Sequence, residues 1–198
     1  MSGGLPTADL RLSCQPGKVG GILVFPYTLR NLGEAAVYAM HAVPSVDPAN
    51  GEARANDQAA VVIMGADGDA IVGKFAAPLP TDRRIAVPVM PLARHLPAGG
   101  SLEGRIEITL PLAETSPYFA DLTLREYESV DINGVLFTIG YWLASAHGLS
   151  AVAAEYAPDL FVVTTRNTLR SALRVSQRFP TTGLQLFKRT DQFPRTLS

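Results

Sequence analysis

The sequence predicts an all-β fold: an antiparallel β-sandwich formed by one domain over residues 1–198, with one or two short helices. Two observations lead to this prediction. Apolar and polar residues alternate with a period of two in several short segments, as they do in half-buried strands. Glycine, proline and asparagine turns separate about eight to ten such segments, a spacing typical of sandwiches and barrels. A chain of 198 residues can bury roughly 70% of its unfolded surface, which is enough for a core of its own.

The first predicted strand runs from Ala8 to Gln15 and ends at a Pro-Gly turn. Its alternation places Leu10, Leu12 and Cys14 on the apolar face. Cys14 is the only cysteine, so the chain can form no internal disulfide. We therefore expect Cys14 to be a small core residue rather than a nucleophile.

The stretch from Ile22 to Val43 is expected to be the central hairpin, with a tight turn at Asn31-Leu32-Gly33. Asn and Gly both tolerate the positive φ that such a turn requires. Pro26 cannot donate a ladder hydrogen bond, so we expect its strand at or near a sheet edge, or a bulge there. This strand, Asn-x-Gly, strand pattern resembles the early hairpin of immunoglobulin-like modules. The resemblance implies an immunoglobulin-like or related sandwich.

The middle of the chain combines short strands with long loops. Asp67-Gly68 predicts a hairpin turn between strands at Ala59–Met64 and Ala70–Phe75. The segment Ile85–Met90 is predicted to be an edge strand, since a proline within it excludes a central position. Long loops are predicted at residues 44–58, 76–101 and 113–134.

Two later segments give the strongest strand signals. Leu102–Leu112 alternates most regularly, and Val135–Ser145 is apolar on both faces, which is typical of a deeply buried strand. We expect the ring N–H of Trp142 to have a hydrogen-bond partner in the core.

The C-terminal quarter is predicted to add a helix and more strands. Its alanine content favours a short helix between His147 and Pro158. A strand follows at Leu160–Thr165, and Thr168–Phe179 and Leu184–Lys188 are expected to form a final hairpin.

Composition and charge exclude several classes of protein. The net charge is −1, so overall charge favours neither nucleic acid nor an acidic ligand, and we do not expect nucleic-acid binding. No apolar run approaches the length of a membrane span. The N-terminal residues carry no basic-then-apolar secretion pattern, so we expect a cytoplasmic location. Charged residues make up 18%, below the usual ~25%, as in surfaces that a partner covers.

No catalytic or metal-binding signature is present. The three histidines, His41, His95 and His147, have no neighbouring cysteine or serine motif that would suggest a triad. The turn Asp67-Gly68-Asp69 is not followed by the further oxygen ligands of a calcium loop. We therefore expect no cofactor and no metal, and a binding protein rather than an enzyme.

One segment combines carboxylates with aromatic residues, the raw material of carbohydrate recognition. It lies between residues 114 and 131. The candidate ligand-binding residues are Glu114, Tyr118, Asp121, Arg125 and Glu126.

A second candidate surface comes from the spacing of arginines near the C-terminus. Arg166, Arg170, Arg174 and Arg178 recur every four residues, so they share a face on a strand and form a stripe on a helix. The last fifth of the chain is basic while the rest is net acidic. This asymmetry favours an acidic partner, and we interpret the four arginines as partner-binding residues.

Two functions from different classes follow. The first is a non-enzymatic binding or assembly module that forms a homo-oligomer or docks on a protein partner through the basic C-terminal face. The second is a carbohydrate- or small-ligand-binding protein, or an enzyme, that uses residues 114–131. A concave pocket is needed by the second and not by the first.

Overall fold

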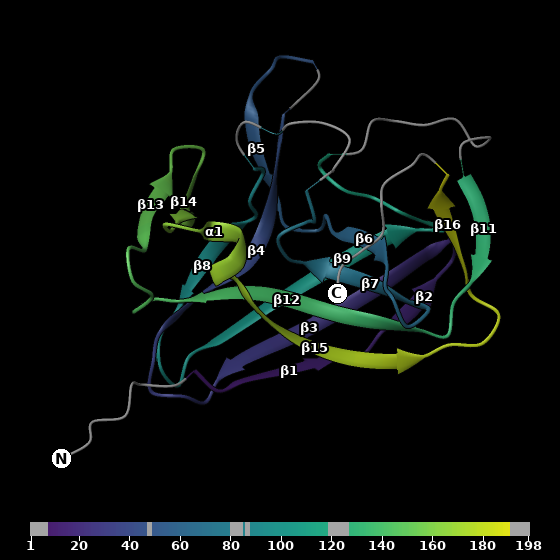
Figure 1. Cartoon of the computed structure of the whole chain (residues 1–198), viewed down its shortest axis with the longest axis horizontal. Coiled ribbons are helices and arrows are strands. Elements are labelled where there is room, and N and C mark those ends of the chain that lie inside the picture. Colours follow the sequence, from purple (N-terminus) through teal and green to yellow (C-terminus); the bar gives the residue numbers. More distant parts are fainter. Residues whose placement is uncertain (1–7, 47–48, 80–84, 86–87, 119–126, 191–198) are drawn as a thin grey trace.

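The computed structural model describes residues 8–46, 49–79, 85, 88–118 and 127–190. These residues are nearly all β, which confirms the predicted class (Figure 1). The one helix among them is the four-residue α1 (Thr168–Ser171). It is too short to cross a bilayer. The described strands are β1 (Leu10–Cys14), β2 (Gly17–Val19), β3 (Ile22–Asn31), β4 (Val37–Val46), β5 (Ala53–Asn56), β6 (Val61–Met64), β7 (Asp69–Lys74), β8 (Leu92–Leu96), β9 (Ser101–Thr109), β10 (Leu112–Ala113), β11 (Tyr127–Asp131), β12 (Gly134–Leu143), β13 (Ser150–Ala154), β14 (Ala157–Thr164), β15 (Leu173–Pro180) and β16 (Gln185–Arg189).

The strands form three hydrogen-bonded sheets. The small sheet has the order β1-β3-β2, with β9 also paired to β3. The large sheet has the order β13-β14-β8-β4-β12-β7-β6, with β15 paired to β12 and β5 paired to β4. The third sheet places β16 between β10 and β11. Most pairs are antiparallel, but β7–β12 and β10–β16 are parallel, so two of the sheets are mixed rather than purely antiparallel.

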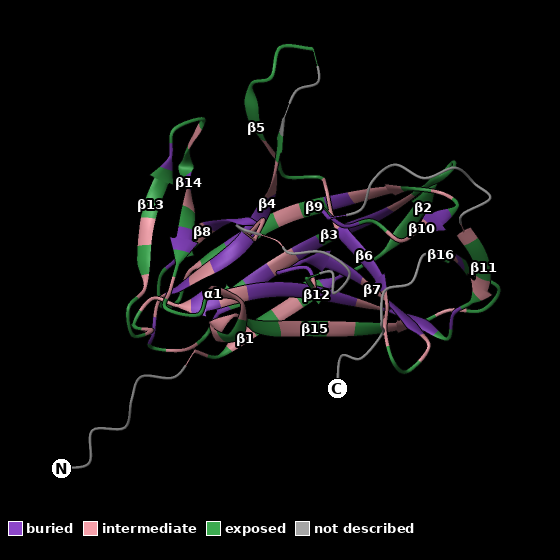
Figure 2. Cartoon of the chain, turned by 45° about the horizontal axis from the view of Figure 1, so that its top comes forward, coloured by how far each residue is buried: buried purple, intermediate pink, exposed green. Residues whose placement is uncertain are grey.

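The main core lies between the small sheet and the large sheet. Phe25 of β3 stacks on Phe137 of β12, with ring centroids 5.4 Å apart and ring planes 7° from parallel. Tyr27 packs on the same ring from the next inward position of β3. Strand geometry turns alternate residues to this core, and Figure 2 shows buried residues concentrated on β3, β4, β7 and β12. Cys14 is buried in this core, as predicted.

The strand β12 pairs with three other strands of the large sheet. It pairs with β15 along one side, and with β7 and then β4 along the other. Trp142 is fully buried on the outer face of this sheet, and its Nε1 donates to the carbonyl of Thr168, 3.1 Å away. Both the deeply buried strand and the partner for the tryptophan N–H are therefore confirmed.

The predicted central hairpin over Ile22–Val43 is wrong, because β3 belongs to the small sheet and β4 to the large one. Asn31 does not form a turn with positive φ. It is fully buried, and its Nδ2 donates to the carbonyls of Ala35 (2.8 Å), Leu96 (3.3 Å) and Pro97 (3.1 Å). These bonds anchor a crossover between the two sheets, so the Asn-x-Gly pattern here marks a change of sheet.

The predicted edge position of Pro26 is also wrong. β9 pairs along one side of β3, while β1 and β2 share the other side. Pro26 falls between the stretches that β1 and β2 cover, and its carbonyl accepts from the backbone N–H of Gln15 at 3.3 Å. The N–H and C=O of a strand residue point to the same side, so the missing donor faces a break between two strands. An inner strand can therefore carry this proline.

Several predictions for the C-terminal quarter are wrong as well. The expected helix between His147 and Pro158 is instead the start of a hairpin, β13 and β14. The strands β15 and β16 do not pair with each other; β15 pairs with β12, and β16 with β10 and β11. In the predicted edge strand Ile85–Met90, residues 85 and 88–90 form no strand, and residues 86–87 lie outside the described part.

The turn predictions hold better. β6 and β7 form the hairpin predicted from Asp67-Gly68, with φ of +79° at Gly68. The three predicted long loops each contain strand residues. The first includes the end of β4 and all of β5, which project from the body as a finger (Figure 1). The second includes β8 and the third β11.

Candidate functional site

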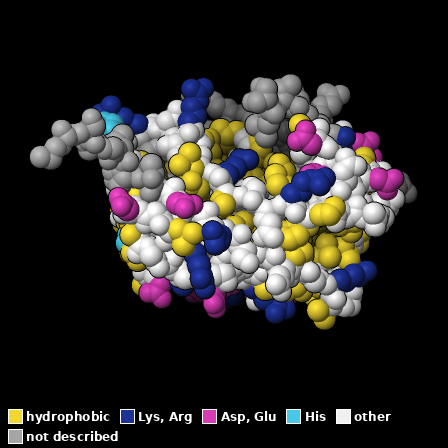
Figure 3. Space-filling model, turned by 90° about the horizontal axis from the view of Figure 1, so that it is seen from below, with side chains coloured by type: hydrophobic (Ala, Val, Ile, Leu, Met, Phe, Trp, Pro, Cys, Tyr) yellow, Lys and Arg dark blue, Asp and Glu magenta, His cyan; other side chains and the backbone are white. Residues whose placement is uncertain are grey.

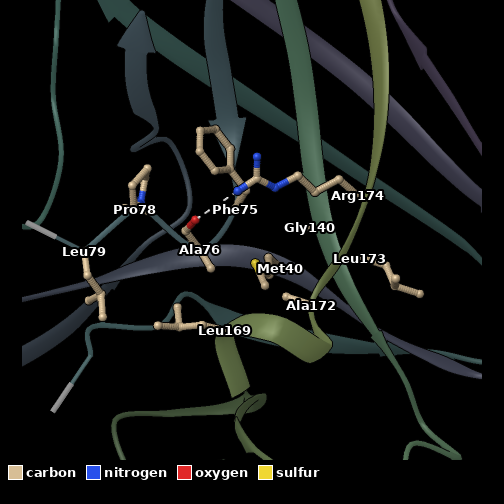
Figure 4. A pocket seen from close by; sticks show the side chains of 11 residues that line it. Met40, Phe75, Ala76, Pro78, Leu79, Gly140, Leu169, Ala172, Leu173 and Arg174 are labelled. Carbon is tan, nitrogen blue, oxygen red and sulfur yellow. Dashed lines mark hydrogen bonds between the residues drawn. The ribbon is translucent and has the colours of Figure 1, made fainter. Parts of the chain in front are cut away.

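A hollow lies on the outer face of the large sheet, beside the segment that follows β7 (Figure 4). Its volume is about 190 Å³. Met40 and Gly140 line it from β4 and β12, and Leu169 and Ala172 line it from α1 and the residue after it. A Cβ at Gly140 would lie 2.5 Å from the Met40 sulfur, so the Met40 side chain would have to shift to admit one. The hollow is therefore apolar on most sides.

Arg174 of β15 supplies the polar part of this hollow. It is the cross-strand partner of Gly140, which has no side chain, so the Arg174 side chain can extend over β12 at that position. Its guanidinium lies over the Phe75 ring, 4.9 Å from the centroid, and Nη2 donates to the carbonyl of Ala76 at 3.4 Å. No carboxylate among the described residues pairs with it. Burial against these groups lowers the pKa of Arg174 from its ordinary value.

The four predicted arginines occupy different elements. Arg166 lies in the turn after β14, Arg170 in α1, and Arg174 and Arg178 on one face of β15. Arg178 forms a bidentate ion pair with Asp69, at 2.6 and 2.9 Å. On the side of the molecule shown in Figure 3, basic side chains are scattered among hydrophobic and acidic ones rather than gathered in one field.

Two of the predicted ligand residues have structural partners. Glu114 accepts from the backbone N–H of Met64 at 2.8 Å and from that of Arg189 at 2.9 Å, so it links β6 to β16. Tyr118 is buried, and its hydroxyl accepts from the N–H of Val89 at 2.9 Å. The other three predicted ligand residues, Asp121, Arg125 and Glu126, lie outside the described residues.

A second hollow, of about 300 Å³, lies between β6 and the end of β9. Residues on either side of Glu114, Ala113 and Thr115, line its wall together with Glu107. Neither Glu114 nor Tyr118 lines it.

A group of polar side chains that the sequence analysis did not select lies between the two sheets. Lys74, at the end of β7, is fully buried. Its Nζ donates to the Tyr27 hydroxyl at 3.2 Å and to the backbone carbonyl of Asp57. Burial lowers the pKa of Lys74 to about 8, against the opposing charge of the Asp57 carboxylate. The signal was present in the sequence, because Lys74 has the same parity as the inward residues Ala70 and Val72.

His41 of β4 belongs to the same group. It is 6% exposed, and its buried Nδ1 has no hydrogen-bond partner. Burial, with the charges of Lys74 and Arg94, lowers the pKa of His41 to about 4. The Nε of Arg94, on β8, is also buried without a partner. Among the described residues no three His, Cys, Asp or Glu side chains are placed to hold a metal ion.

Comparison of the sequence with protein-family models and with curated proteins finds no match.

Proposed function

We propose that this chain is a non-enzymatic β-sandwich module that docks on an acidic segment of a protein partner through the outer face around Arg174. A sandwich, immunoglobulin-like or related, is supported by the two sheets that face each other across one core and by the crossover from β3 to β4. The observation that carries the docking function is the arginine itself. It lies beside an apolar hollow, and no carboxylate of the described residues pairs with it.

The size of the hollow favours a protein side chain over a whole small molecule. Ligand pockets usually enclose roughly 300–1,000 Å³, whereas this hollow holds about 190 Å³. Leu79 and Leu173 stand at its rim and are 38% and 42% exposed. An arginine next to a small pocket with an apolar rim is the usual composition of an interface hot spot.

The partner's chemistry follows from these contacts. One apolar side chain would enter the hollow, and a neighbouring carboxylate would pair with the Arg174 guanidinium. The planar guanidinium can accept such a carboxylate in a bidentate geometry while it stays stacked on Phe75. Arg178 is less suited to this role because Asp69 already occupies it. The second function, ligand binding by residues 114–131, is less well supported, since Glu114 and Tyr118 serve the fold.

The test uses defined peptides in which leucine or phenylalanine adjoins aspartate or glutamate, measured by fluorescence anisotropy. We expect binding by the wild type and a loss of at least about tenfold in Arg174→Gln, the usual effect of removing a hot-spot arginine. Arg170→Gln removes the same charge from the neighbouring helix and should change the affinity less than about twofold.

Equal weakening by the two variants would show a general charge effect and contradict the proposal, as would no binding of any acidic-apolar peptide. Sedimentation of the wild type at low and high salt tests whether the partner is instead a second copy. If the wild type forms salt-sensitive dimers and Arg174→Gln does not, the partner is a second copy of this chain rather than a different protein.

A further inference from the structure

We propose that Lys74, His41 and Arg94 form a binding site for a small oxyanion, a phosphate, sulfate or carboxylate group, between the two sheets. The three residues come from three strands of the large sheet, β7, β4 and β8. Lys74 and Arg94 lie on the side of their strands that faces the small sheet, since Val72 and Leu96 on the same faces belong to the main core. His41 lies near them, because the charges of Lys74 and Arg94 both act on it.

The pairing registers bring Lys74 and His41 to the same place. Lys74 is the partner of Ile139 on β12, and it is the last residue of β7. The strand β4 pairs with β12 from Val37 to Ala39, and the same register continued by two residues would place His41 level with Ile139. At this point along β12 its pairing changes from β4 to β7. Lys74 and His41 therefore lie together where β4 and β7 diverge.

Arg94 joins them from the other side of β4. It is the cross-strand partner of Ala39, two residues before His41. The β4–β8 register shifts between Met40 and Ala42, so His41 is the extra residue of a bulge. Bulges redirect a side chain and are frequent beside functional sites. The charges of both Lys74 and Arg94 act on His41, which places all three groups in one region.

The hydrogen bonds of this region are incomplete. Lys74 uses two of its three ammonium donors, on the Tyr27 hydroxyl and the Asp57 carbonyl. The buried Nε of Arg94 and the buried Nδ1 of His41 have no partner. Buried polar groups in folded proteins are nearly always satisfied, and an exception calls for a bound ion or water. Two cationic side chains with spare N–H donors outnumber the one carboxylate that acts on them, that of Asp57, and this balance favours an anion.

The region lies next to residues that reach the surface. Arg94 is only half-buried, and Asp57, whose carbonyl holds Lys74, is exposed. An oxyanion there would accept hydrogen bonds from Arg94 and Lys74, and a third from the Nδ1–H of a neutral His41 tautomer. Tyr27 would hold the ammonium in position from the small sheet. This site is on the opposite face of the large sheet from the Arg174 hollow, so it does not depend on the docking function.

The experiment measures thermal unfolding and calorimetric binding of the full chain with inorganic phosphate, sulfate or acetate, against chloride at equal ionic strength. We expect about 20 mM phosphate to raise the melting temperature by about 4 °C or more, the result for a dissociation constant near 1 mM. Arg94→Gln and Lys74→Met should each weaken binding by at least about tenfold. Arg105→Gln, an exposed arginine of β9, should leave it unchanged, and Arg174→Gln tests whether the anion binds the outer face instead.

Phosphate and sulfate without acetate would identify a tetrahedral anion, and all three would identify a carboxylate-compatible site. A shift no larger than that of chloride would overturn the proposal. So would equal phosphate binding by the wild type and Arg94→Gln, a substitution at a half-buried position. Loss of binding in Arg174→Gln alone would assign the anion to the outer face and reject the inter-sheet site.

Discussion

Replacing Lys74 by methionine should stabilise the fold at neutral pH, and this gain should disappear as the pH rises. Methionine has nearly the same length and no charge, so it fits the apolar surroundings that β7 shares with the main core. The ammonium of Lys74, in contrast, is fully buried without a carboxylate hydrogen-bonded to it. Its removal isolates the free-energy cost of burying that charge.

The magnitude follows from the pKa of Lys74, which is about 8 in the fold against an ordinary 10.5. This difference corresponds to about 3 kcal/mol of destabilisation while the amine is protonated in both states. Methionine loses the hydrogen bonds to Tyr27 and to the Asp57 carbonyl, which offsets about 1–2 kcal/mol. We therefore expect the variant to be about 1–2 kcal/mol more stable than the wild type at pH 7.

The pH dependence gives the sharper test. Between pH 8 and 10.5 the unfolded wild type binds more protons at Lys74 than the folded protein does, so wild-type stability rises with pH in this window. Burial raises the pKa of Cys14 to about 12 and that of Tyr27 above its ordinary value. Cys14 lowers stability at alkaline pH in both proteins and cancels in the difference. Tyr27 loses its hydrogen bond from Lys74 in the variant, but with an ordinary pKa of 10.0 it contributes little below pH 9.5.

The assay is urea unfolding of wild type and Lys74→Met at half-unit steps from pH 6.5 to 9.5, in a buffer free of phosphate and sulfate. The stability difference should shift toward the wild type by about 2 kcal/mol over this range, most of the full 3 kcal/mol. A difference that stays constant across the range would refute the reasoning about the buried charge. A methionine variant that is less stable at pH 7 would show that the lost hydrogen bonds outweigh it.

Three further changes test other parts of the structure. The pKa of His41 is lowered to about 4 from 6.5, so on acidification the unfolded chain binds a proton at His41 before the folded protein does. The free energy of unfolding of the wild type should therefore fall by up to about 3 kcal/mol between pH 6.5 and 4. If the stability of His41→Gln falls in parallel with that of the wild type over this range, His41 is not the cause. Gly104→Ala should cost about 1–3 kcal/mol in urea unfolding, since the new Cβ would lie 2.3 Å from the Tyr27 hydroxyl oxygen; an unchanged midpoint would mean that the ring can move aside freely. Glu114→Gln keeps one acceptor for two backbone N–H groups and should cost about 2 kcal/mol, whereas Glu128→Gln, at a largely exposed ion pair, should cost under about 1 kcal/mol; similar values for both would remove the structural role of Glu114.

The parts of the fold that local sequence determines were predicted well. Strand β1, the turn at Gly68 and the buried strand β12 each follow from alternation, turn chemistry or continuous apolarity within about ten residues. Pairing between distant segments was not predictable in the same way. An Asn-x-Gly sequence between two strands fits a hairpin and a sheet crossover equally well, and the choice depends on Leu96 and Pro97, whose carbonyls bind Asn31.

The helix predicted before Pro158 failed for a related reason. Alanine favours a helix locally, but Ala151, Ala153 and Ala154 pair across to β14, where the sheet edge supplies hydrogen bonds. Tertiary pairing therefore overrode intrinsic propensity.

The candidate sites show the same division. Arginine spacing selected Arg174 and Arg178 together, but only the fold separates the one that is stacked beside a hollow from the one that is paired with Asp69. The alternation of β7 could have placed Lys74 on the core-facing side of the strand, with Ala70 and Val72. The meeting of Lys74 with His41 depends on a parallel pairing that no local pattern encodes.

The parallel pairing of β7 with β12 also bears on how the chain acquires its structure. Val135 of β12 lies opposite Ala70, 65 positions earlier in the chain. Closing a loop of that length costs roughly 4 kcal/mol of chain entropy before any contact is gained. Until β12 has been synthesised, Phe25 has no aromatic stacking partner, and the edges of β4 and β7 that pair with β12 lack their neighbouring strand. Nascent chains that stop short of residue 134 should therefore be the form most exposed to aggregation, and the folding of the full chain should be slow.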